Sequence, residues 1–126
     1  MEETILVIDD DAVYLRMMTI ALEREGYRLI SANHGDIGLK MLRDQQPDLV
    51  VVDIAMPGID GYDVVRRIRA QEREDRHTPI IILTAHARPL MRADAEDLGV
   101  DLFLTKPVSL DRLFEHLRTL TTPSVE

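Results

Sequence analysis

The sequence contains no cysteine, and this absence removes several kinds of chemistry at once. The chain has no disulfide framework, no thiolate nucleophile and no cysteine-ligated metal site. The absence fits a reducing compartment, and we expect a cytoplasmic protein. Long apolar runs are also missing: none approaches the roughly 20 residues that span a bilayer, and no signal-peptide pattern opens the chain. We therefore expect no membrane partner.

Basic residues are in short supply. The chain has 15 lysines and arginines against 23 aspartates and glutamates, a formal net charge of −8 at pH 7. Proteins that grip nucleic acid carry a basic face, because neutralising phosphates supplies much of their affinity. We therefore expect no direct contact with nucleic acid. Solubility explains most of the acids, but those at the ends of apolar runs need another reason.

What is present is ordinary globular sequence of single-domain size. The 126 residues are 45% hydrophobic and 30% charged, which is usual for one soluble domain. We expect that domain to occupy residues 1–120. Residues 121–126 are predicted to be a C-terminal tail or the start of a linker, since Pro123 cannot continue the last helix.

Five short apolar runs alternate with five helical patterns. The runs occupy residues 5–8, 27–30, 49–52, 80–83 and 102–104. Three of them are nearly all β-branched residues or leucine, which is typical of strands buried on both faces, whereas the mixed second run suits a sheet edge. Strict alternation predicts an α/β fold: a single doubly wound (βα)5 domain. Its parallel five-stranded sheet is expected in the flavodoxin-like order 2-1-3-4-5.

The helical patterns differ in strength. The first helix carries an apolar stripe from Tyr14 to Leu22 and is ended by Gly26. The last carries one from Leu110 to Leu120, with Ser109 as its N-cap. The second is weakened by Gly38 in its interior. The second, third and fourth helices are expected over about Asp36 to Arg43, Asp60 to Glu74 and Pro89 to Leu98.

Polar residues follow four of the predicted strands. In an open α/β sheet, ligands bind outside the carboxyl ends of the strands, at the switch in strand order. The residues that follow strands one, three, four and five are Asp9, Asp10, Asp11, Asp53, Thr84 and Lys106. Because these four strands are neighbours in the predicted order, the side chains converge on one pocket.

Such a pocket suits phosphoryl chemistry. Carboxylates held together repel each other unless a cation lies among them, and hard oxygen ligands without histidine or cysteine favour Mg²⁺. The Lys106 ammonium and the Thr84 hydroxyl supply charge neutralisation and a hydrogen-bond donor for a transferred phosphoryl group. A carboxylate fixed at a strand end can be the nucleophile, and Asp53 is the candidate.

Each of these side chains also has an ordinary structural explanation when taken alone. Aspartates after a strand often cap the next helix, and capping explains Asp11 at least as well as metal contact. Asp9 and Asp10 can be caps or solvated acids, and an isolated threonine or lysine there is usually a turn hydroxyl or a surface charge. Only their shared position at strand ends favours a site.

The motifs at these positions, taken in order, resemble one family. They are ILVIDDD at 5–11, PDLVVVD at 47–53, MPGIDG at 56–61, ILTA at 82–85 and LTKP at 104–107. The set resembles the receiver domains of response regulators in two-component signalling, over nearly the whole chain from Thr4 to about Leu120. Any one motif is weak, but the complete ordered set is specific.

The resemblance implies a phosphoacceptor site. Asp53 would take a phosphoryl group from a phosphohistidine on a sensor histidine kinase or phosphotransfer protein, or from a small phosphodonor. Asp9, Asp10 and Asp53, with the backbone carbonyl of Ala55, would hold Mg²⁺. Lys106 would pair with Asp53 at rest and with the phosphoryl oxygens afterwards.

The resemblance also implies a switch. Thr84 would move to hydrogen-bond the phosphoryl group, Phe103 would swing inward behind it, and the Lys106–Pro107 bond would be cis. The change would bias the face formed by helix four, strand five and helix five, through which family members form homodimers or bind targets. The output is left open, as an attached domain or a separate target protein.

Several positions depart from the commonest family pattern, among them Val100 and Gly38, which replace common alanines and affect only packing. Phe103 stands where tyrosine is frequent. Ala55, two residues after Asp53, and His86, two residues after Thr84, lie where family members tune dephosphorylation. The small Ala55 leaves Asp53 open to water, whereas His86 either shields it or is a solvated loop residue.

Two other functions deserve comparison with a non-enzymatic signalling receiver. A Mg²⁺-dependent phosphohydrolase with an aspartyl nucleophile usually carries a second aspartate two residues later as general acid, and that position here is Ala55. A flavin-binding module of the same fold would need a Ser/Thr/Gly-rich phosphate loop, whereas the first loop here is three aspartates, which repel phosphate. Both are therefore disfavoured.

Overall fold

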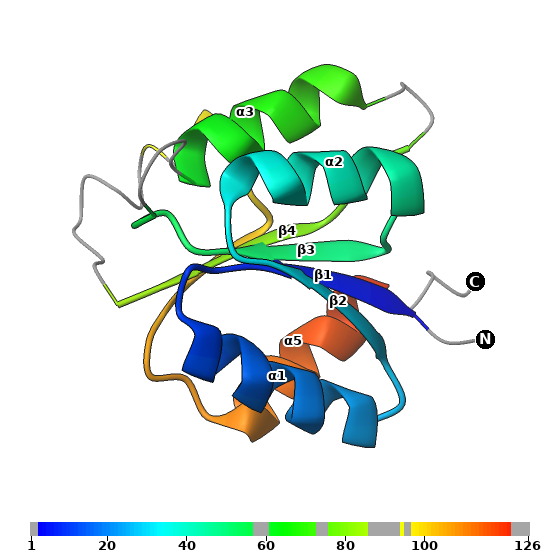
Figure 1. The fold of residues 1–126 in the computed structure, drawn as a ribbon, viewed down its shortest axis with the longest axis vertical. Helices are drawn as coiled ribbons and strands as arrows, with labels where there is room; N and C mark the ends of the chain where they lie inside the picture. The colour runs from blue at the N-terminus through cyan, green and yellow to red at the C-terminus, as the bar shows by residue number, and fades with distance from the viewer. Residues whose placement is uncertain (1–2, 57–60, 73–75, 86–93, 95–96, 122–126) are drawn as a thin grey trace.

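The computed structural model has a parallel five-stranded sheet between two layers of helices (Figure 1). It describes residues 3–56, 61–72, 76–85, 94 and 97–121. The strands are β1 (Thr4–Ile8), β2 (Arg28–Ala32), β3 (Leu49–Val52), β4 (Ile80–Thr84) and β5 (Leu102–Thr105). Their order is β2-β1-β3-β4-β5 and each neighbouring pair is parallel, which confirms the predicted doubly wound α/β fold.

Helices cover both faces of the sheet. The described helices are α1 (Ala12–Arg24), α2 (Gly35–Gln45), α3 (Gly61–Gln71) and α5 (Leu110–Thr121). In Figure 1, α2 and α3 lie over one face, and α1 and α5 lie over the other. The helix predicted over about 89–98 falls almost wholly outside the described residues. Within the described part of the chain, no helix has the length and apolar character needed to cross a bilayer.

Capping hydrogen bonds and one glycine define the ends of α1 and α5. The Asp11 carboxylate accepts from the N–H groups of Val13 (3.0 Å) and Tyr14 (3.1 Å), so Asp11 is the N-cap of α1. The Ser109 hydroxyl accepts from the N–H of Arg112 at 3.2 Å and caps α5 as predicted. Gly26, with φ of +92°, follows α1 in a conformation that favours glycine.

Several boundaries differ from the prediction by one to three residues, and two of them have a visible cause. Helix α2 begins at Gly35 rather than Asp36, because the His34 ring nitrogen accepts from the N–H of Asp36 (3.3 Å) and makes His34 the N-cap. Helix α3 ends at Gln71, short of Glu74. The Glu72 carboxylate instead accepts from the N–H of Thr78 at 2.6 Å, which turns the chain towards β4.

The core lies on both faces of the sheet. Every residue of β3 and β4 is buried, with Ile80, Ile81 and Ile82 fully inaccessible, as their continuous apolar runs predict. Strand β2 is one edge of the sheet and is only partly covered. Figure 1 shows its neighbour β1 inside the sheet between the two helix layers.

Gly38 has a packing reason to be glycine. A Cβ built at this position of α2 would overlap the Ile8 side chain, coming within 2.7 Å of its Cγ1. Ile8 is 1% exposed and cannot move away without disturbing the core. The helix therefore gives up some intrinsic propensity so that it can approach β1 closely.

We expect Gly38→Ala to lower the free energy of unfolding by about 1–3 kcal/mol, although alanine is the better helix former. Urea unfolding followed by circular dichroism measures this change. The double variant Gly38→Ala/Ile8→Val, which shortens the obstructing side chain, should lose less than the sum of the two single variants. Additive losses, or a more stable Gly38→Ala, would show that the helix does not need this close approach.

Candidate functional site

Strand register brings the predicted site residues together. Ile8 of β1 pairs with Val52 of β3, so the next residues, Asp9 and Asp53, emerge side by side. The N–H of Asp53 donates to the Ile8 carbonyl at 3.0 Å and holds this end of the sheet closed. On the other side, the N–H of Lys106 donates to the carbonyl of Thr84 at 2.8 Å. The carboxyl ends of β1, β3, β4 and β5 thus border one site.

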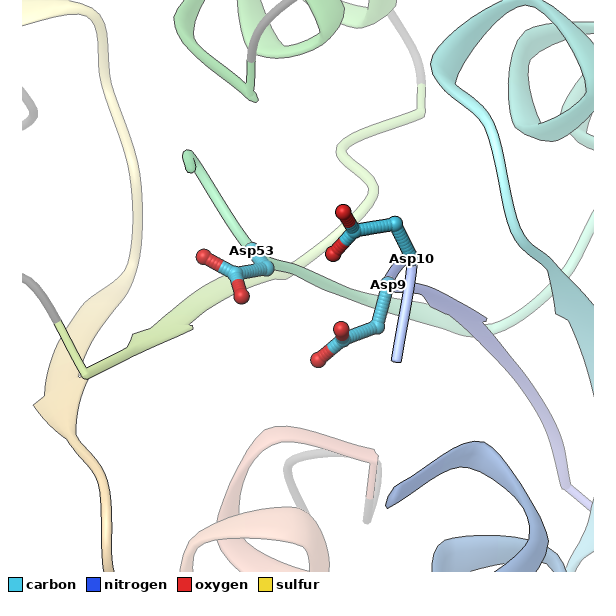
Figure 2. Close-up of side chains that lie close together, drawn as sticks. All are labelled: Asp9, Asp10 and Asp53. Atoms are coloured by element: carbon cyan, nitrogen blue, oxygen red, sulfur yellow. The ribbon is translucent and has the colours of Figure 1, made fainter. Parts of the chain in front are cut away.

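Three carboxylates form the centre of the site. Figure 2 shows Asp9, Asp10 and Asp53 gathered beyond the ends of β1 and β3. One oxygen from each lies within 4.8 Å of the others. Asp9 is 3% exposed and Asp53 is 7% exposed, whereas Asp10 is exposed to solvent. Asp9 and Asp53 are therefore largely removed from water, whereas Asp10 lies on the solvent side of the group.

Local turns orient the two buried carboxylates. Asp9 Oδ1 accepts from the N–H of Asp11 at 3.0 Å, and Asp53 Oδ1 accepts from the N–H of Ala55 at 2.9 Å. In each case Oδ2 turns towards Lys106. Each of the two carboxylates is thus held in its orientation by the backbone N–H two residues later.

Lys106 bridges the buried acids. Its Nζ lies 2.7 Å from Asp9 Oδ2 and 3.3 Å from Asp53 Oδ2. The family resemblance implies the pairing with Asp53, but the shorter bond is to Asp9. Burial opposes the charge of Lys106, yet the hydrogen bond and negative charge of Asp9, together with Asp53, outweigh it and raise its pKa above the ordinary value. Lys106 is therefore a fixed positive charge.

The site remains short of positive charge. Burial raises the pKa of Asp9, and the nearby charge of Asp53 adds to the rise, although Lys106 and the Asp11 N–H oppose it. Among the residues that the structure describes, three carboxylates face one ammonium. Oxygen ligands in this arrangement fit a hard divalent cation such as Mg²⁺, so the donor set agrees with the predicted cofactor.

Both predicted switch residues are buried. Thr84 is fully buried at the end of β4. Phe103 is 5% exposed and belongs to the core cluster between the sheet and the layer of α2 and α3. Phe103 is thus buried in this structure, and its inward movement on phosphorylation stays a prediction. The Lys106–Pro107 bond is cis, as the resemblance implies.

The last two predicted site residues are Ala55 and His86. Ala55 is exposed beside Asp53, and its carbonyl remains a predicted cation ligand. His86 lies outside the described residues, so its predicted tuning role is not tested.

Two neighbours of the site were missed by sequence reasoning. The Tyr14 ring lies under Lys106, with its centroid 4.1 Å from Nζ, although the apolar stripe predicts only a core residue there. Gly61 packs directly against the backbone of Asp53 and Ile54, where a Cβ would overlap the chain. The MPGIDG motif at 56–61 could have pointed to Gly61. Tyr14 belongs to the apolar stripe of the first helix, so helical periodicity gives no sign of its contact with Lys106.

Comparison with known proteins identifies the family. A family model described as the response regulator receiver domain matches residues 5–118. The chain belongs to this family.

Curated relatives agree. The receiver domain is 40% identical over 105 residues to the transcriptional regulatory protein AfsQ1 of Streptomyces coelicolor, covering 83% of this chain and 45% of the relative. It is 36% identical over 109 residues to the alkaline phosphatase synthesis transcriptional regulatory protein PhoP of Bacillus subtilis, covering 86% and 44%. The chain therefore spans about half the length of these relatives.

Solved structures share the fold. The chemotaxis protein CheY4 of Vibrio cholerae superposes with a TM-score of 0.88 at 25% identity, covering 95% of this chain and 99% of that one. A CheY-like response regulator receiver domain protein of Methanospirillum hungatei gives a TM-score of 0.88 at 25% identity, covering 94% and 93%. The protein is thus a receiver domain of the kind found in two-component response regulators.

The shortage of positive charge predicts stabilisation by Mg²⁺. At a concentration 100 times the dissociation constant, a ligand that binds only the folded state adds about 2.7 kcal/mol. We expect Mg²⁺ to raise the thermal unfolding midpoint of the wild type and to have much less effect on Asp10→Asn, which loses an exposed ligand. Asp44→Asn, in the last turn of α2, is the control and should respond like the wild type. Equal responses in all three proteins would contradict a cation site at Asp10.

Proposed function

We propose that this receiver domain takes a phosphoryl group onto Asp53 from the phosphohistidine of a sensor histidine kinase or phosphotransfer protein. The observation that carries the proposal is the setting of the Asp53 carboxylate. It is almost buried, lies within reach of two further carboxylates and has Lys106 at 3.3 Å. A nucleophile held beside a fixed ammonium and a cation site suits transfer of an anionic group.

The proposed transfer is a displacement at phosphorus. An Asp53 carboxylate oxygen forms the new O–P bond while the bond from phosphorus to the donor imidazole nitrogen breaks. The bonding pair leaves with the imidazole. The product is an acyl phosphate on Asp53 and a histidine free to bind a proton. Asp53 Oδ1 is oriented by the N–H of Ala55, and Oδ2 faces the Lys106 ammonium, which neutralises developing charge on the phosphoryl oxygens.

Mg²⁺ is the proposed cofactor. Asp9, Asp10 and Asp53 would hold it together with the backbone carbonyl of Ala55. When bound, the ion would supply positive charge next to the phosphoryl oxygens, which the three carboxylates otherwise repel. Within this scheme Asp9 has two roles, because its other oxygen holds Lys106 at 2.7 Å.

The proposed output begins at the carboxyl ends of β4 and β5. Phosphorylation replaces about one negative charge at Asp53 by roughly two and adds strong acceptors, which attract the Thr84 hydroxyl and the Lys106 ammonium. Thr84 and Lys106 are joined by a backbone hydrogen bond of 2.8 Å, so β4 and β5 respond together. The face of helix four, β5 and α5 would then bind a target, an output domain or a second copy of the chain.

Several features favour a purely signalling function. The relatives are named transcriptional regulators, but the net charge of −8 argues against nucleic-acid binding by this domain itself. Ala55 offers no general acid beside Asp53, which argues against phosphohydrolase turnover. We propose a cytoplasmic, non-enzymatic receiver whose chemistry is restricted to its own phosphorylation and dephosphorylation.

Phosphorylation can be tested without the cognate kinase. Incubation with Mg²⁺ and acetyl phosphate should add one phosphoryl mass to the intact wild type, measured by mass spectrometry. Asp53→Asn should add none, because the amide is not a comparable nucleophile. Asp44→Asn, an exposed acid in the last turn of α2, should behave like the wild type. A wild type without an adduct, or an adduct retained by Asp53→Asn, would rule out Asp53 as the acceptor.

A further inference from the structure

Tyr14 occupies a defined position beside the phosphoryl site. It lies in the first turn of α1, and its N–H donates to the capping Asp11 carboxylate at 3.1 Å, which fixes the start of the helix. Its side chain is half-buried, and the centre of its ring lies 4.1 Å from Lys106 Nζ. An ammonium at this distance is attracted by the electron-rich face of the ring.

The structure shows three contacts of the Lys106 ammonium, and the Tyr14 ring is the uncharged one of the three. The other two, Asp9 at 2.7 Å and Asp53 at 3.3 Å, are carboxylates. Both are proposed cation ligands, and Asp53 is the proposed phosphoryl acceptor, so the charge around each changes during the cycle. Burial raises the pKa of the Tyr14 phenol, with Lys106 opposing and the two aspartates adding to the rise, so the ring stays uncharged.

A flexible lysine between two unequal partners needs a further restraint. The shorter bond draws the ammonium towards Asp9, whereas its proposed task is at Asp53. Fixing a lysine side chain costs conformational entropy, and a contact that persists through every state of the site limits that cost. The half-buried ring also covers part of the ammonium from water, which strengthens its attraction to phosphoryl oxygens.

We propose that Tyr14 is a positioning residue for phosphoryl transfer, whose ring face holds the Lys106 ammonium in place beside Asp53. The inference rests on the proposed function. It assigns the effect to the aromatic face and not to the hydroxyl, so phenylalanine should replace Tyr14 and an aliphatic residue should not.

The test compares Tyr14→Leu, which keeps apolar bulk but has no ring, with Tyr14→Phe, which keeps the ring. The matched control is Tyr27→Leu, because Tyr27 is another half-buried tyrosine packed against the same core cluster as Tyr14. Thermal unfolding of each variant confirms that it folds. If Tyr14→Leu fails to fold, Tyr14→Met replaces it.

The first readout is the NMR signal of the Lys106 ε-protons, recorded on the whole chain without phosphodonor. The ring current of Tyr14 should shift this signal upfield in the wild type, in Tyr14→Phe and in Tyr27→Leu. In Tyr14→Leu the signal should move towards that of a free lysine. The second readout is the rate of phosphorylation by acetyl phosphate with Mg²⁺, which should fall about three- to tenfold in Tyr14→Leu and stay near the wild-type rate in Tyr14→Phe.

The outcomes separate the inference from the proposed function. A wild-type rate in Tyr14→Leu, or an equally slow Tyr14→Phe, overturns the inference and leaves the phosphoacceptor site standing. An unshifted Lys106 signal in the wild type overturns the contact itself. A wild type that acetyl phosphate does not modify overturns the proposed function, and the role of Tyr14 with it.

Discussion

The Lys106 ammonium, shared between two buried carboxylates, is the interaction on which the site depends. Asp9 and Asp53 are both more than nine-tenths buried, and their carboxylates repel each other. The bonds of 2.7 and 3.3 Å from Lys106 offset part of that repulsion. Among the described residues they leave the site with an excess of negative charge, which suits a small divalent cation.

The fold supplies this arrangement through strand order. Because β1 and β3 are neighbours in register, Asp9 and Asp53 are adjacent although they lie 44 positions apart in the sequence. Because β5 lies next to β4, Lys106 is tied to Thr84 by the backbone. The same bonds that build the sheet thus connect the proposed phosphoacceptor to the strands bordering the proposed output face. Gly61 lets α3 lie against the Asp53 backbone and leaves that segment little room to move.

The sequence predicted the sheet, its order and the convergence of the strand-end residues, since these follow from apolar runs and from the rules for parallel sheets. It left Asp11 open between cap and ligand, because an aspartate serves both purposes and only the bonds to Val13 and Tyr14 decide. The short Lys106–Asp9 bond and the Tyr14 ring contact join distant segments, so no local pattern encodes them. The buried position of Phe103 depends likewise on the packing of α2 and α3.

The central claim is that charge added at Asp53 reaches the β5–α5 face through Thr84 and Lys106. Amide NMR spectra of the wild type with Mg²⁺, recorded before and after addition of beryllofluoride as a stable phosphoryl mimic, test it most directly. The account predicts changes at Asp53, Thr84 and Lys106 that continue through β5 into α5, and none of them in Asp53→Asn. Changes confined to the immediate neighbours of Asp53, with β5 and α5 unaffected, would contradict it.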